Sequence, residues 1–149
     1  MDPDHRVRHC ARVVAVLRMR VDRALVIDAA VLGAALVLFC LNNQVIKEAI
    51  AGTPVGDFFK NYFNDVLGGI AFLAYTNIVI GLVRPAVRLR RLMPIAAYLF
   101  LCGLFWEYAA PLFVAGSVSD PWDVACYVVG GVGYGAVLRF CRMRDAAAS

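Results

Sequence analysis

The sequence predicts an all-α transmembrane protein, and three observations lead to that fold class. Of the 149 residues, 62% are hydrophobic and 17% are charged, whereas an average soluble domain is about half apolar and roughly a quarter charged. Four apolar stretches approach the roughly 20 residues that a helix needs to cross a hydrocarbon core. Arginines gather in three blocks beside those stretches. This combination excludes a disordered chain, a nucleic-acid-binding module and an ordinary cytosolic enzyme.

The four apolar stretches are predicted to be helices, because every backbone polar group must be paired internally where water is absent. The alternation of polar and apolar residues that membrane-spanning strands require is not visible. Thr76 and Asn77 interrupt the second stretch, and we expect them to make hydrogen bonds between helices. The result is a four-helix transmembrane bundle over residues 24–138, with spans at 24–41, 66–83, 95–114 and 122–138.

The orientation of the bundle follows from its Lys and Arg residues. An N-terminal arm (1–23), the connection between the second and third helices, and a C-terminal tail (139–149) together hold 13 of the 15. The other two connections hold only Lys47 and Lys60. The positive-inside rule therefore predicts that both termini are cytoplasmic. Two interpretations of the basic arm stay open, an interfacial helix on anionic lipid and a solvated tail.

Acidic residues gather at the opposite, outer end of the predicted bundle. Asp65, preceded by Asn64, opens the second helix, and Asp120 and Asp123 lie at the start of the fourth. Glu107 lies about 20 Å along the third helix, at 1.5 Å per residue. An ionisable group within a bilayer is costly unless it is paired, hydrated or protonated, so it indicates a functional site by default. We therefore predict a ligand-binding site formed by Asn64, Asp65, Glu107, Asp120 and Asp123.

Capping is the structural alternative for the three aspartates, because carboxylates at a helix start stabilise the free N–H groups. No catalytic motif or cofactor signature accompanies the acidic residues, and the sequence leaves a metal undecided. His5 and His9 are spaced as two metal ligands, but two ligands in a terminal arm make a poor site. Gly131 and Gly135 have the GxxxG spacing of close helix packing. That packing is either within the bundle or between copies in a homo-oligomer.

Three short motifs resemble the VanZ-like family of bacterial membrane proteins. The motifs are Phe63-Asn64-Asp65-Val66-Leu67, the stretch Glu107-Tyr108-Ala109-Ala110-Pro111, and Ser117-Val118-Ser119-Asp120-Pro121-Trp122-Asp123-Val124 with the glycine-bearing helix that follows. The resemblance covers roughly residues 57–138 and is closer to a short group sometimes labelled magnesium–citrate secondary transporters. Asp65, Glu107, Asp123 and Gly130 match the family's acidic and glycine positions. Val66 and Gly69 stand where Lys and His are usual, and Tyr127 and Val128 where Asn is common.

The resemblance implies a multi-pass protein of the bacterial plasma membrane with a role in the cell envelope. Three functions are compatible with the residues. The first is non-catalytic binding of a lipid headgroup, an envelope precursor or a cation at the outer acidic site. The second is a small oligomeric transporter in which Glu107 carries a proton or cation. The third is a membrane enzyme that acts on a lipid-linked substrate with paired carboxylates as acid and base.

Overall fold

The computed structural model describes residues 23–84, 87–109, 112–113 and 120–147. Within those ranges the chain is helical and contains no strand. The predicted basic arm, with His5 and His9, lies outside the described residues except for Arg23. Both interpretations of the arm therefore stay open.

Four helices are long and apolar enough to cross a membrane, as the sequence predicts. They are Arg23–Ala49, Phe63–Val83 (α4), Leu92–Ala109 and Pro121–Ala147 (α6). The first ends in a π-helical segment, Asn42–Ile46 (η1), and a last turn, Lys47–Ala49 (α2). The third consists of Leu92–Leu104 (α5) and a π-helical segment, Phe105–Ala109 (η2). The first and last of the four extend well beyond their predicted spans.

A further helix, Pro54–Asn61 (α3), lies in the connection between the first two long helices and was not predicted. Thr53 caps it, since the Thr53 hydroxyl accepts a hydrogen bond from Gly56 N at 3.0 Å. Pro54 occupies the first turn, where its missing N–H costs nothing. The backbone turns into this helix through Gly52, whose φ of 81° favours glycine. The sequence does not predict α3 as an apolar span, because α3 is short and carries exposed polar residues.

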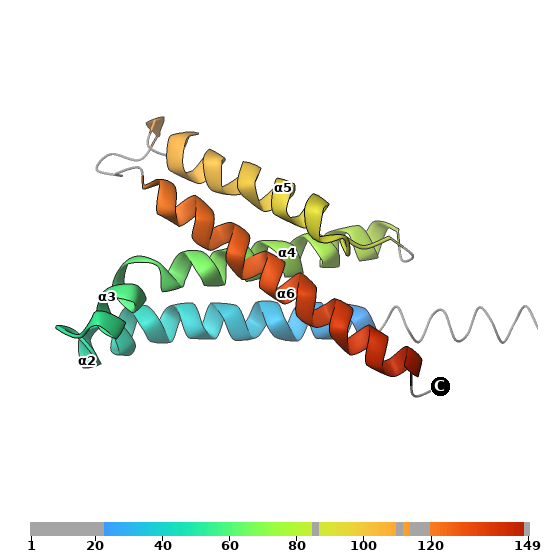
Figure 1. Ribbon diagram of the computed structural model, residues 1–149, viewed down its shortest axis with the longest axis horizontal. Helices are drawn as coiled ribbons and strands as arrows, with labels where there is room; N and C mark the ends of the chain where they lie inside the picture. Colours follow the sequence, from blue (N-terminus) through green and yellow to red (C-terminus); the bar gives the residue numbers. More distant parts are fainter. Residues whose placement is uncertain (1–22, 85–86, 110–111, 114–119, 148–149) are drawn as a thin grey trace, which may run out of the picture.

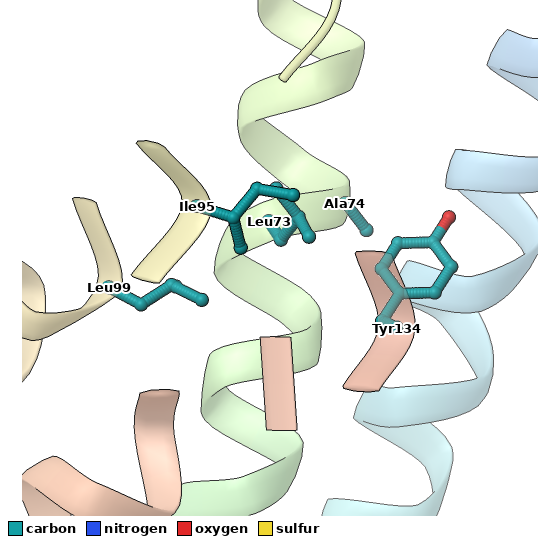
Figure 2. Close-up of a cluster of buried hydrophobic side chains, with 5 residues drawn as sticks. All are labelled: Leu73, Ala74, Ile95, Leu99 and Tyr134. Carbon is teal, nitrogen blue, oxygen red and sulfur yellow. The ribbon is translucent and has the colours of Figure 1, made fainter. Parts of the chain in front are cut away.

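The interior of the protein is organised around α6, which packs extensively against both α4 and α5. Figure 2 shows the core cluster that results, formed by side chains from these three helices. Its five members are Leu73, Ala74, Ile95, Leu99 and Tyr134. The first helix joins this cluster through Val31 and Leu32. Many large apolar side chains on the outer faces remain exposed in the protein alone, which is the expected state of surfaces that contact lipid.

Glycines bring α4 and α6 into backbone contact. No Cβ fits at Gly69, because the backbone carbonyl of Tyr127 on α6 occupies that position. The same is true of Gly130, against the carbonyl of Val66 on α4. Small residues permit such close approach between membrane helices. The α4–α6 contact is therefore closely packed at Gly69 and Gly130.

The two ends of the protein differ in charge. One end of the protein holds the starts of α4 and α6, the end of the third long helix, and α2 and α3 (Figure 1). This acidic end carries Asp65, Glu107, Asp120 and Asp123. At the basic end, the first helix begins, α4 ends, α5 begins and α6 ends. The basic end carries Arg84, Arg88, Arg90, Arg91, Arg139, Arg142 and Arg144.

Candidate functional site

Three carboxylates converge at the acidic end. Asp65 lies in the first turn of α4, Glu107 in η2 and Asp123 in the first turn of α6. The three side chains are half-buried. They are near enough to repel one another, since the charges of Asp123 and Glu107 both act on Asp65, and the charge of Glu107 acts on Asp123. The charge of Asp120 also acts on Asp123, so the structure brings together four of the five predicted site residues.

Each of the three elements that supplies a carboxylate also supplies an aromatic ring. The Phe72 ring of α4 lies 6.5 Å from the Trp106 ring of η2, centroid to centroid, in an edge-on arrangement. The Tyr127 ring of α6 lies 6.1 Å from Phe72. Tyr127 also lies against Gly68, where a Cβ would meet its ring. Negative side chains and aromatic rings both attract cations, the rings through their quadrupole.

Capping explains part of the acidic end. The Asp120 carboxylate accepts a hydrogen bond from Trp122 N at 2.9 Å, in the first turn of α6. The Glu107 carboxylate accepts one from Asp120 N at 2.8 Å, and so joins the end of the third helix to the start of the fourth. Asp120 thus acts as a helix cap, as the structural alternative proposes. Glu107 both repels the other carboxylates and stabilises the backbone that leads into α6.

Asn64 does not join the carboxylates but forms an amide cluster with the first helix. Asn42 donates to the Asn64 side-chain oxygen at 2.9 Å, and Asn64 donates to the Asn43 oxygen at 3.1 Å. Lys47 completes the cluster by donating to Asn43 at 2.8 Å. Asn42 is fully buried and also donates to the Phe59 carbonyl. This cluster fixes the first helix against the start of α4.

Both π-helical segments of the described chain lie at the acidic end. η1 carries the amide cluster and η2 carries Glu107. A π-helical turn inserts an extra residue and redirects side chains, and such turns are frequent at functional sites. Within the described ranges, no group of three or more His, Cys, Asp and Glu side chains is arranged to hold a metal ion.

A second polar network, near the basic end, was not predicted. Asp28 of the first helix is 3% exposed and accepts a hydrogen bond from the Tyr134 hydroxyl at 2.7 Å. Figure 2 shows the Tyr134 hydroxyl directed toward the first helix. Arg88, from the connection after α4, places its Nε 3.7 Å from the other Asp28 oxygen. Three segments far apart in sequence thus meet at one buried ion pair.

Arg88 reaches this position by folding back onto α4. Its guanidinium occupies the space beside Gly81 where a side chain would be, and it donates to the Asn77 carbonyl. The Asn77 side chain in turn accepts from Leu89 N at 2.8 Å. Nε and Nη2 of Arg88 are buried and have no hydrogen-bond partner among the described residues. The connection is therefore fixed to α4 on both sides of the arginine.

Asp28 is the feature of the sequence that indicates this network. A lone carboxylate in an apolar helix requires a partner, and the nearby arginines belong to the same end of the bundle. The prediction for Thr76 is confirmed, since its hydroxyl bonds to Tyr98 of α5 at 2.6 Å. Asn77 makes its hydrogen bonds to the α4–α5 connection instead of to a neighbouring helix.

Comparisons with known proteins leave the family open. No protein-family model matches the chain, and the searches of curated proteins and of solved structures return no match.

Proposed function

We propose that this chain is a VanZ-like, multi-pass protein of the bacterial plasma membrane that binds a positively charged headgroup at its acidic end. The headgroup is an ammonium carried by a membrane lipid or an envelope precursor. Both termini face the cytoplasm in this proposal, which puts the acidic end on the outer side. The protein acts by binding and not by catalysis.

The observation that carries this proposal is that the three elements whose carboxylates repel one another also supply three aromatic rings that pack together. Asp65 and Phe72 come from α4, Glu107 and Trp106 from η2, and Asp123 and Tyr127 from α6. Mutual repulsion among half-buried carboxylates is relieved by a bound cation. Aromatic faces stabilise an ammonium by about 0.5–2 kcal/mol each, depending on desolvation. An amine headgroup satisfies both requirements at the level of the membrane surface.

The close packing of α4 against α6 at Gly69 and Gly130, a layer beneath the acidic site, favours binding over transport. The contacts of Gly69 with Tyr127 and of Gly130 with Val66 leave no space between α4 and α6. A carrier needs a continuous route that opens alternately to each side. The acidic end and the Asp28–Arg88 pair are polar regions on either side of that packed layer. Transport through Glu107 would require the layer to separate.

The binding proposal is tested with phosphatidylethanolamine as the probe and phosphatidylglycerol, which lacks the amine, as the comparison. Purified full-length protein in a neutral detergent is mixed with each lipid, and native mass spectrometry measures the bound fraction. We expect Asp65→Asn, Glu107→Gln and Asp123→Asn each to reduce phosphatidylethanolamine retention several-fold. Phosphatidylglycerol retention should be unchanged in these variants.

Glu48→Gln is the matched control, because Glu48 is exposed and lies in α2 at the same end. It removes one negative charge without touching the three carboxylates. Thermal unfolding of every variant separates loss of binding from loss of folding. Equal retention of phosphatidylethanolamine by the wild type, the control and the three site variants would overturn the proposal.

The orientation is tested separately by labelling with a membrane-impermeant thiol reagent in intact cells. The native cysteines are first replaced by alanine, and a single cysteine is introduced at exposed Glu48 or exposed Arg91. We expect Glu48→Cys to be labelled and Arg91→Cys to be protected. The reverse pattern would place the acidic end in the cytoplasm.

A further inference from the structure

Among the side chains that the structure describes, the basic end carries several arginines and one carboxylate, Asp28. Arg88 is almost fully buried, with 4% of its side chain exposed, and its neighbour Asp28 supplies one negative charge. Two of its guanidinium nitrogens, Nε and Nη2, have no hydrogen-bond partner within the described chain. Buried donors of this kind are rare in folded proteins and point to a group that the protein alone does not provide.

Arg90 and Arg142 lie beside this buried arginine. Leu89 of the connection and Leu138 of α6 both pack against the core cluster. Arg142 lies one turn after Leu138 on the same face of α6. The charges that act on Arg90 are those of Arg142, Arg88 and Asp28. Partial desolvation and then the positive charges of Arg142 and Arg88 lower the pKa of Arg90.

The depth of this cluster matches that of lipid phosphates. α4 has 21 residues and is about 31 Å long at 1.5 Å per residue, so the connection that follows it leaves a hydrocarbon core of about 30 Å. About 20 residues of α6 also cross such a core, which places Arg142 just beyond it. Arg90 and Arg142 are exposed at this level, whereas the side chain of Arg88 is buried.

We propose that Arg90 and Arg142, with Arg88 beside them, form a binding site for a phosphate group at the basic end. Guanidinium groups bind phosphate through paired, charge-assisted hydrogen bonds. One phosphate reduces the net positive charge of the three arginines. Its oxygens accept hydrogen bonds from their guanidinium groups. The phosphate comes from the headgroup of an anionic lipid or from free phosphate in solution. The site does not depend on the binding of a cation at the acidic end.

The test uses purified full-length protein and three probes: phosphatidylglycerol, diacylglycerol, which lacks the phosphate, and inorganic phosphate. Native mass spectrometry measures lipid retention, and the shift in thermal unfolding measures the effect of each probe. We expect phosphatidylglycerol to be retained at least several-fold better than diacylglycerol. Arg90→Gln and Arg142→Gln should each reduce that retention several-fold, and the double variant about tenfold. Both arginines are exposed, so these variants should fold normally.

Arg144→Gln is the matched control, because Arg144 is exposed on α6 only two residues after Arg142. At 100° per residue it lies on nearly the opposite face of the helix. Its retention of phosphatidylglycerol should equal that of the wild type. A stabilising effect of inorganic phosphate that disappears in Arg90→Gln and Arg142→Gln would assign the site to free phosphate. Equal losses in all three variants, or losses in none, would overturn the proposal, because retention would then depend on net charge or on neither arginine.

Discussion

The acidic end and the Asp28–Arg88 network arrange their charged side chains in opposite ways. At the acidic end, carboxylates from three helices repel one another, and the positive charge of Lys47 also acts on Asp65. In the network, a carboxylate, a guanidinium and a tyrosine hydroxyl from distant segments are joined within one buried cluster. The first arrangement concentrates negative charge at one end of the protein. The second stabilises the fold. The comparison separates the residues that we propose bind a ligand from the residues that hold distant segments together.

The largest expected effect of a single change is that of Arg88→Ala. Removing one partner of a buried ion pair leaves Asp28 uncompensated, and such changes cost about 3–5 kcal/mol of unfolding free energy. Chemical denaturation in detergent measures this loss. Arg91→Ala, an exposed arginine in the same connection, is the control and should be nearly silent. If the two variants are equally stable, the Asp28–Arg88 pair does not stabilise the fold and the comparison fails.

Tyr134→Phe removes only the hydroxyl that donates to Asp28. A hydrogen bond to a charged group contributes about 1.5–3 kcal/mol, so we expect a destabilisation within that range. The ring stays in the core cluster, which excludes a cavity as the cause. Tyr75→Phe, at an exposed tyrosine of α4, provides the control. A silent Tyr134→Phe would mean that Asp28 does not need this donor.

Gly130→Ala probes the close α4–α6 contact that lies between the two regions. The added methyl group has no space beside the Val66 carbonyl, and overpacking costs about 1–3 kcal/mol. Gly133→Ala on the same helix is an unusually close control, because nothing lies within 4 Å of its Cβ position. That variant should be neutral or more stable by up to about 1 kcal/mol, since alanine favours helix over glycine. Equal stability of the two variants would argue against a closely packed layer.

The smallest expected effect is that of Asp65→Asn. The change relieves repulsion by Asp123 and Glu107 and keeps the size of the side chain. The unfolding free energy should stay within about 0.5 kcal/mol of the wild type or rise. Asp28→Asn, the same chemical change in the buried network, should destabilise the protein measurably because Arg88 then lacks its counter-charge. A greater loss in Asp65→Asn than in Asp28→Asn would reverse the comparison.

The sequence predicts the four spans well because hydropathy and length are local properties. The ends of the helices are harder, as the helix from Arg23 to Ala49 shows by extending past the predicted residue 41. The convergence of Asp65, Glu107 and Asp123 was predictable from topology and rise per residue. The bond from Asp120 N to Glu107 was not, because it depends on how the third helix ends relative to the fourth.

The position of Arg88 was also beyond prediction, because it needs Gly81 to leave space and Asn77 to hold the connection. The connection makes both contacts when it folds back onto α4, so neither contact leaves a periodic pattern in the sequence. The sequence does not predict α3, for a different reason. Its eight residues begin with a proline and are too few and too polar to register as a span.

The buried network also sets an order of events during biosynthesis. Asp28 enters the membrane with the first helix, whereas Arg88 follows the second and Tyr134 belongs to the last. The carboxylate therefore acquires its cation only after two helices have been inserted, and its hydroxyl partner only when the chain is nearly finished. A truncated chain would present an uncompensated acid within the bilayer. One aspartate thereby makes the stability of the assembly conditional on the completeness of the polypeptide.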